Sequence, residues 1–112
     1  MKAAVFMEPG KVEIHDVPKP TIDGDNQAII RVVRASVCGS DLWWYRGIAK
    51  RQANSLVGHE AIEVVESVSD DVDQIKPGDF VIVPFTHGCG HCVACVNGFE
   101  GNCLNQKPGT NG

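Results

Sequence analysis

Short apolar segments separated by turn-forming residues make up most of the chain. Residues 27–35 (QAIIRVVRA) and 61–68 (AIEVVESV) are rich in β-branched side chains, which favour strands. The run FVIV at 80–83 follows a Lys-Pro-Gly-Asp turn and indicates a buried strand. Residues 2–6 are apolar, and apolar and polar residues alternate over 11–15. About five short strands at this spacing predict a mainly β fold, either a barrel or a sandwich.

One segment departs from this strand pattern. Ser40 and Asp41 precede the letters LWWYRG, and both residue types favour a helix N-terminus. Gly47 suits the helix end, where a left-handed backbone conformation is common. One short helix is therefore expected after position 40. Residues 16–25 contain two prolines and Gly24, and we expect them to form a loop.

Composition indicates a soluble globular domain. The 112 residues are 43% hydrophobic and 21% charged, which is too apolar for a disordered chain and sufficient for a core. The net charge is −4 and basic runs are no longer than two residues, so neither nucleic-acid binding nor membrane insertion is expected. Because the N-terminus lacks the features of a signal peptide, we expect a cytoplasmic protein, in which clustered cysteines hold metal more often than they form disulfides.

Four of the five cysteines lie within the segment GCGHCVACVNGFEGNC, with the spacing C-x2-C-x2-C-x7-C. Four thiolates suit a tetrahedral zinc ion, and the interspersed glycines let the backbone wrap tightly around it. Because such a site fills every coordination position, its role is structural. A zinc lobe is expected over about 86–105, with four ligands: Cys89, Cys92, Cys95 and Cys103.

Other interpretations of this cluster remain open. An iron–sulfur cluster also takes four cysteines, but the bacterial ferredoxin run has three residues before the last cysteine and a proline after it, whereas here the gap is seven and Leu104 follows. Disulfides would require an oxidising compartment, and four unliganded thiols this close together would be unusual. His91 could also replace one thiolate as a ligand.

Cys38 and His59 form a second, sparser pair. Cys38 lies in VCGSD, between a strand and the helix, and His59 lies in GHE at the start of another strand. Such positions can converge at the mouth of a barrel. Taken singly, a buried thiol and a strand-edge histidine are the simpler interpretations.

The order CGSD, GHE, PGD and C-x2-C-x2-C-x7-C resembles the zinc-dependent alcohol dehydrogenases of the medium-chain dehydrogenase/reductase family, along the whole chain. The resemblance implies a GroES-like β-barrel catalytic domain over 1–112, which in the family precedes a Rossmann domain for NAD(H) or NADP(H). It implies that Cys38 and His59 bind a catalytic zinc, whose third protein ligand comes later in the family's chain. Glu60 would lie beside the ion and can enter its coordination sphere, and Asp41 would accept a hydrogen bond from His59.

The implied reaction converts an alcohol to an aldehyde or ketone by hydride transfer to the nicotinamide. Ser40 is placed by the motif to pass the alcohol proton toward solvent. Many relatives complete this relay with a histidine five positions after the cysteine, where Trp43 stands here, so the relay must run differently. We expect Trp43 or Trp44 to line a substrate pocket, although both could instead pack the helix against the barrel.

Other features depart from the family pattern. Glu63 and Ser69 replace small residues that the family usually has, and we find no G-x-G-x-x-G motif after a strand. The chain is therefore expected to be the N-terminal portion of a longer enzyme, ending in a loop over 107–112, with exposed apolar surface and no hydride transfer by itself. The alternative function is a stand-alone zinc-binding, chaperonin-like module that self-associates as a homo-oligomer or complements a partner chain. A small iron–sulfur electron carrier is a third function.

Overall fold

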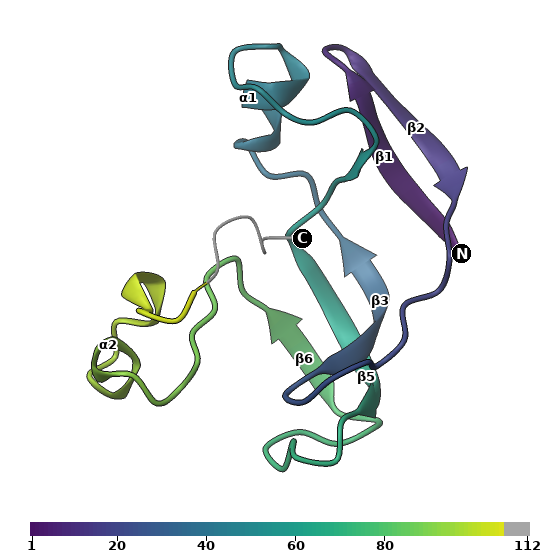
Figure 1. Cartoon of the computed structure of the whole chain (residues 1–112). Helices are drawn as coiled ribbons and strands as arrows, with labels where there is room; N and C mark the ends of the chain where they lie inside the picture. Colours follow the sequence, from purple (N-terminus) through teal and green to yellow (C-terminus); the bar gives the residue numbers. More distant parts are fainter. Residues whose placement is uncertain (107–112) are drawn as a thin grey trace.

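The computed structural model describes residues 1–106, which form a mainly β fold, as expected from the sequence (Figure 1). The elements are β1 (Lys2–Glu8), β2 (Lys11–Asp16), β3 (Ala28–Ala35), α1 (Asp41–Tyr45), β4 (Ser55–Leu56), β5 (Ala61–Val68), β6 (Phe80–Val83), α2 (Val93–Val96) and the 3-10 turn η1 (Glu100–Asn102). The loop expected over 107–112 lies outside the described residues. Within residues 1–106, none of the helices has the length and apolar run that crossing a membrane requires.

The strands form two antiparallel sheets of three strands each, in the orders β2-β1-β4 and β3-β5-β6. In Figure 1 the first sheet and α1 occupy the upper part of the molecule, the second sheet lies below, and the segment that carries α2 projects to one side. Strand β5 pairs with β3 on one side and with β6 on the other. This central position explains its apolar composition, because both of its edges and one of its faces are covered.

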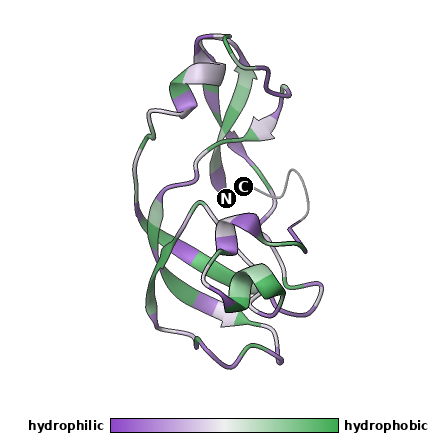
Figure 2. Ribbon diagram, turned by 90° about the vertical axis from the view of Figure 1, so that its left-hand side faces the viewer, coloured by the Kyte–Doolittle hydropathy of each residue, from purple (hydrophilic) through white to green (hydrophobic). Residues whose placement is uncertain are grey.

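The most buried apolar side chains divide between the two sheets. Val5 and Phe6 of β1 are each 3% exposed, and Val65 of β5 is 2% exposed. The run at 80–83 forms strand β6, but it is not buried as expected, since Phe80 is 63% exposed and Ile82 is 74% exposed. These side chains contribute exposed apolar surface. Figure 2 shows apolar residues concentrated along the strands of both sheets.

Helix α1 forms at the expected position. Ser40 is its N-cap, but the Ser40 side chain makes no capping hydrogen bond. Asp41 instead accepts a hydrogen bond from the backbone N–H of Cys38 through Oδ2 (3.0 Å). Gly47 follows the helix with a φ of +76°, a conformation that glycine adopts without strain. The structure adds a second helix, α2, within the cysteine-rich segment.

Glu63 is a charged residue on the core face of β5, the face it shares with Val65. It is only 5% exposed, and its Oε2 has no hydrogen-bond partner within residues 1–106. Burial raises the pKa of Glu63 above its ordinary value of 4.5, because the charged form loses hydration. Burial therefore works against the charged form of Glu63.

Glu63→Gln should stabilise the chain at neutral pH. Because the folded pKa is raised, the stabilising contribution of protonated Glu63 is fully present below the unfolded pKa and is lost as the pH rises through the folded pKa. The variant should gain about 1 kcal/mol of unfolding free energy near pH 7, and the gain should shrink toward pH ~4. Urea unfolding across this range measures the difference. The exposed Glu8→Gln should show little change, and a Glu63→Gln gain that does not vary with pH would contradict the burial argument.

Candidate metal centres

Two groups of side chains have their potential ligand atoms within 4.8 Å of one another. The first group consists of Cys89, Cys92, Cys95 and Cys103, and the second of Cys38, His59 and Glu60. The structure thus brings together both sets of residues singled out from the sequence. The five cysteines, all within the described part of the chain, are free thiols.

Backbone amides surround the sulfur atoms of the four-cysteine cluster. The N–H of Cys92 donates to Cys89 Sγ (3.3 Å), and the N–H of Cys95 donates to Cys92 Sγ (3.5 Å). The N–H of Cys89 donates to Cys103 Sγ (3.3 Å), which ties the two ends of the lobe together. Amide donors of this kind favour the thiolate over the thiol. His91 stands outside the sulfur group, and its Nδ1 lies 2.9 Å from the Cys89 carbonyl oxygen.

The four thiols do not titrate alike. The backbone N–H of His91 is the largest of several hydrogen bonds that lower the pKa of Cys89 to about 5. The N–H of Cys95 is the largest influence that lowers the pKa of Cys92. The N–H of Gly90 favours the Cys95 thiolate, but burial and the neighbouring sulfur atoms together outweigh it and raise the pKa of Cys95 to about 12. Full ionisation of the cluster therefore calls for a cation among the sulfurs.

The cluster fits a tetrahedral metal ion. Zinc–sulfur bonds of about 2.3 Å in a tetrahedron place the sulfurs about 3.8 Å apart. The Sγ atoms of Cys89 and Cys95 are 4.0 Å apart, close to that value. Gly88 allows this packing, because a Cβ there would lie 2.7 Å from Cys95 Sγ and 3.1 Å from Glu100 Cβ.

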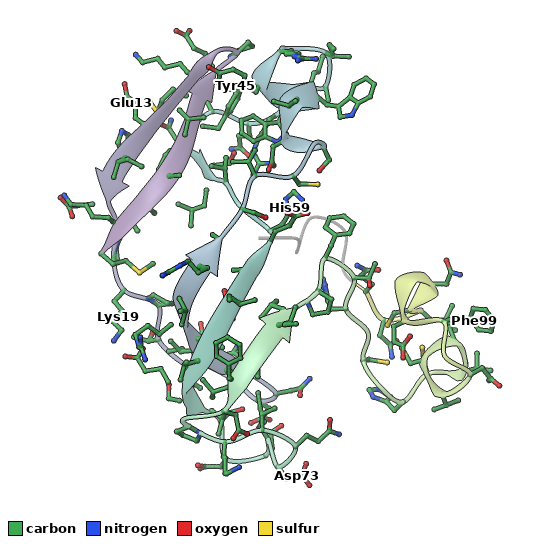
Figure 3. The ribbon with its side chains drawn as sticks, turned by 180° about the vertical axis from the view of Figure 1, so that it is seen from behind. Glu13, Lys19, Tyr45, His59, Asp73 and Phe99 are labelled. Atoms are coloured by element: carbon green, nitrogen blue, oxygen red, sulfur yellow. The ribbon has the colours of Figure 1, made fainter. Side chains whose placement is uncertain are left out.

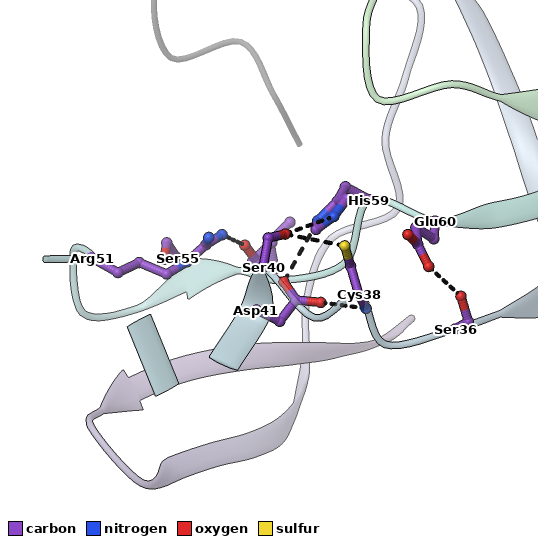
Figure 4. A network of polar contacts seen from close by, with 9 residues as sticks. Ser36, Cys38, Ser40, Asp41, Arg51, Ser55, His59 and Glu60 are labelled. Atoms are coloured by element: carbon purple, nitrogen blue, oxygen red, sulfur yellow. Dashed lines mark hydrogen bonds and ion pairs between the residues drawn. The ribbon is translucent and has the colours of Figure 1, made fainter. Parts of the chain in front are cut away.

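The second cluster forms where β3 ends and β5 begins. Ala35 pairs with Ala61 at the end of the ladder, and Cys38 and His59 lie in the segments just beyond this pair. Gly58, with a φ of +112°, turns the chain immediately before His59. Figure 3 shows His59 just before the start of β5. The pairing of the two strands thus places a thiol and an imidazole from distant parts of the sequence side by side (Figure 4).

Polar contacts orient the thiol and the imidazole of this cluster (Figure 4). His59 Nδ1 lies 3.5 Å from Asp41 Oδ1, and Asp41 is only 8% exposed. The Ser40 hydroxyl donates to Cys38 Sγ at 3.2 Å and lies 3.3 Å from His59 Nε2. Asp41 therefore faces one ring nitrogen of His59, while Nε2 faces the thiol side of the cluster.

Glu60 directly follows His59 in the chain, and its carboxyl group is the third member of the cluster. The Ser36 hydroxyl donates to Glu60 Oε2 at 2.5 Å. This hydrogen bond is the largest cause of a lowered Glu60 pKa, and a contact with the Cys38 side chain is the next. The carboxyl group is therefore held in its ionised form, which is the form that binds metal.

A cavity of about 170 Å³ adjoins the second cluster, and Trp44 forms part of its wall. Its other lining residues are Ser40, Asp41, Arg51, Gly58, His59 and Phe85. The Trp44 ring packs edge-on against Phe6, with 5.1 Å between ring centroids, so it also holds α1 against the first sheet. Trp43 is 57% exposed and does not line this cavity.

Three residues at this site were not identified from the sequence. Arg51 lies 5.0 Å from the Trp44 ring centroid and donates through Nε to Ser55 Oγ. The Phe85 ring lies 5.5 Å from that of His59. Ser36 contacts Glu60, although it belongs to no motif identified in the sequence. Phe85 could have been suspected only because it follows the apolar strand β6 closely.

Comparison with known proteins identifies the class of domain. Residues 24–112 match the family model described as the alcohol dehydrogenase GroES-like domain. The chain is 39% identical over 104 residues to AdhB, a zinc-type alcohol dehydrogenase-like protein of Bacillus subtilis, covering 92% of this chain and 28% of that protein. It is 35% identical over 113 residues to a glutathione-independent formaldehyde dehydrogenase of Pseudomonas aeruginosa, covering 96% of this chain and 28% of the relative.

Solved structures agree with this class. The alcohol dehydrogenase TADH from Thermus sp. ATN1 superposes with a TM-score of 0.87 at 35% identity, over 93% of this chain and 30% of that one. The apo form of zinc-dependent alcohol dehydrogenase 2 from Streptococcus pneumonia gives a TM-score of 0.84 at 36% identity, over 95% and 31%. The chain belongs to the alcohol dehydrogenase GroES-like domain family, and these relatives are zinc-type alcohol dehydrogenases of the medium-chain family. It spans about three tenths of these relatives' length.

Gly88→Ala should weaken metal retention in the cysteine lobe, because the new methyl group would displace Cys95 Sγ. A chelator concentration roughly ten-fold lower than that needed for the unsubstituted chain should remove the metal from the variant. Zinc release can be followed with a colorimetric indicator. Gly101→Ala is the matched control, because its Cβ would meet only Thr86 Cγ2, at 3.8 Å. Equal retention by the two variants would show that Gly88 is not needed for the sulfur packing.

Proposed function

We propose that this chain is the metal-binding catalytic-domain portion of an NAD(P)-dependent zinc alcohol dehydrogenase. The observation that carries the proposal is the convergence of Cys38, His59 and Glu60, whose ligand atoms lie within 4.8 Å of one another. One thiolate, one imidazole and one carboxylate are all zinc ligands, and three protein ligands leave a coordination position open for substrate. The family relationship supports the same interpretation.

The residues around this centre have distinct roles in the proposal. Zinc, when bound, supplies Lewis-acid chemistry that lowers the pKa of an alcohol hydroxyl. Asp41 holds the Nδ1 side of His59, which leaves Nε2 for the metal. Ser40, adjacent to both Cys38 Sγ and His59 Nε2, takes the alcohol proton toward solvent. Trp44 is the better placed of the two tryptophans to contact a substrate, since it lines the adjoining cavity.

The four-cysteine cluster has a structural role in the proposal. Its sulfurs would fill all four positions of a zinc ion and leave none for substrate. The lobe contains only α2 and the turn η1 as regular structure, and Cys95 is its one buried apolar residue. Metal-binding free energy would therefore supply much of the stability of this lobe.

We assign NAD(P) binding to the part of the relatives' chains that lies outside the region aligned with these 112 residues. The relatives are more than three times as long as the aligned region. We therefore expect no NAD(P)H production when this chain alone is mixed with NAD(P)+ and an alcohol. Measurable production, followed by absorbance, would show that the chain binds the cofactor itself.

Substitution should separate the two centres. The unsubstituted chain should retain about one zinc after dialysis against a weak chelator, held by the cysteine lobe. Cys103→Ser should lose this zinc and lower the melting temperature by about 5 °C or more. Cys38→Ser should leave both values nearly unchanged. Elemental analysis and thermal unfolding give the two readouts, and an unaffected Cys103→Ser variant would refute the structural assignment.

Cobalt substitution tests the proposed catalytic centre directly. Co²⁺ bound by Cys38 should give visible absorption, and an alcohol entering the open position should shift these bands. Cys38→Ser should abolish the alcohol-dependent shift, whereas Trp43→Ala should preserve it, because Trp43 does not line the cavity. Cobalt bands that do not respond to any alcohol would contradict an open substrate position.

A further inference from the structure

We propose that Ser36 is a positioning residue that holds Glu60 in place as a metal ligand beside Cys38 and His59. This inference rests on the proposed function of that centre. Ser36 lies two residues before Cys38, and its hydroxyl donates to Glu60 Oε2 at 2.5 Å, within the range of charge-assisted hydroxyl–carboxylate hydrogen bonds. The contact joins the strand segment that carries the thiol to the one that carries the imidazole.

The backbone fixes the two residues opposite each other. The N–H of Ser36 donates to the carbonyl oxygen of Glu60 at 3.1 Å, directly beyond the last paired residues of β3 and β5, Ala35 and Ala61. Both the main chain and the side chain of Ser36 therefore contact Glu60. This backbone hydrogen bond continues the pairing of β3 with β5, so it fixes the main chain of Ser36 relative to Glu60. The Ser36 hydroxyl can therefore orient the Glu60 carboxylate.

Glu60 needs such a partner. Its side chain is exposed, and an exposed glutamate loses considerable rotamer freedom when it is held in one conformation. The Ser36 hydroxyl orders the carboxylate before any metal arrives, so that one carboxylate oxygen already lies within 4.8 Å of the Cys38 and His59 ligand atoms. Preorganisation of this kind raises metal affinity without adding a ligand.

The substitution Ser36→Ala isolates this role. It removes the hydroxyl but keeps the backbone N–H that donates to Glu60, so the strand pairing should persist. We expect Co²⁺ affinity at the Cys38 centre to fall roughly ten-fold, as read from the visible bands that depend on Cys38. Ser36→Thr, which retains a hydroxyl, should bind nearly as tightly as the unsubstituted chain. Zinc retention in the four-cysteine lobe should not change, which controls for misfolding.

A double-substitution cycle separates positioning from a general structural effect. In a Glu60→Ala background, Ser36→Ala should cause no further loss of Co²⁺ affinity, because the residue it positions is absent. An undiminished affinity in Ser36→Ala, or an equal loss with and without Glu60, would overturn the inference and leave the proposed function standing. The absence of any Cys38-dependent cobalt bands in the unsubstituted chain would overturn the proposed function and the inference together.

Discussion

The pairing of β3 with β5 is the interaction on which the rest of the candidate site depends. Strand register is specified because one face of β5 is buried, and a slip of one residue would turn Val65 away from the core. The same register sets the ladder end at Ala35 and Ala61, and so decides which residues meet beyond it. The thiol of Cys38 and the imidazole of His59 are neighbours because of a hydrophobic pattern located several residues away from either.

The sequence predicted β5, β6 and α1 but missed β4 and α2. The composition of 61–68 and 80–83 led to the bounds that β5 and β6 have in the structure. Strand β4 has only two residues, too few for any alternation to be visible, and it exists because β1 offers it an edge. Helix α2 has four residues and follows its N-cap, Cys92, whose sulfur accepts from the N–H of Cys95. Its sequence is dominated by residues that serve the sulfur cluster, so helical periodicity could not reveal it.

The residues of the candidate site also divide into those that the sequence identified and those that only the structure revealed. The residues inside motifs, such as Cys38 and His59, were identified by resemblance to a family, whereas periodicity alone would have left them as an ordinary thiol and histidine. Ser36 and Arg51 could not be identified, because their relevance arises from contacts across the fold, to Glu60 and to Trp44. Glu63 was visible as a departure from the family pattern, but only the structure shows that its carboxyl group is buried.

The candidate site draws on both sheets of the molecule. The ligand-bearing segments extend from the β3–β5 ladder, whereas Trp44 packs on Phe6 of β1, and the N–H of Gly10 in the β1–β2 turn donates to the carbonyl oxygen of Tyr45. Because α1 also carries Asp41, which faces His59, a substitution in the N-terminal hairpin can alter both the cavity wall and the orientation of the metal-binding imidazole.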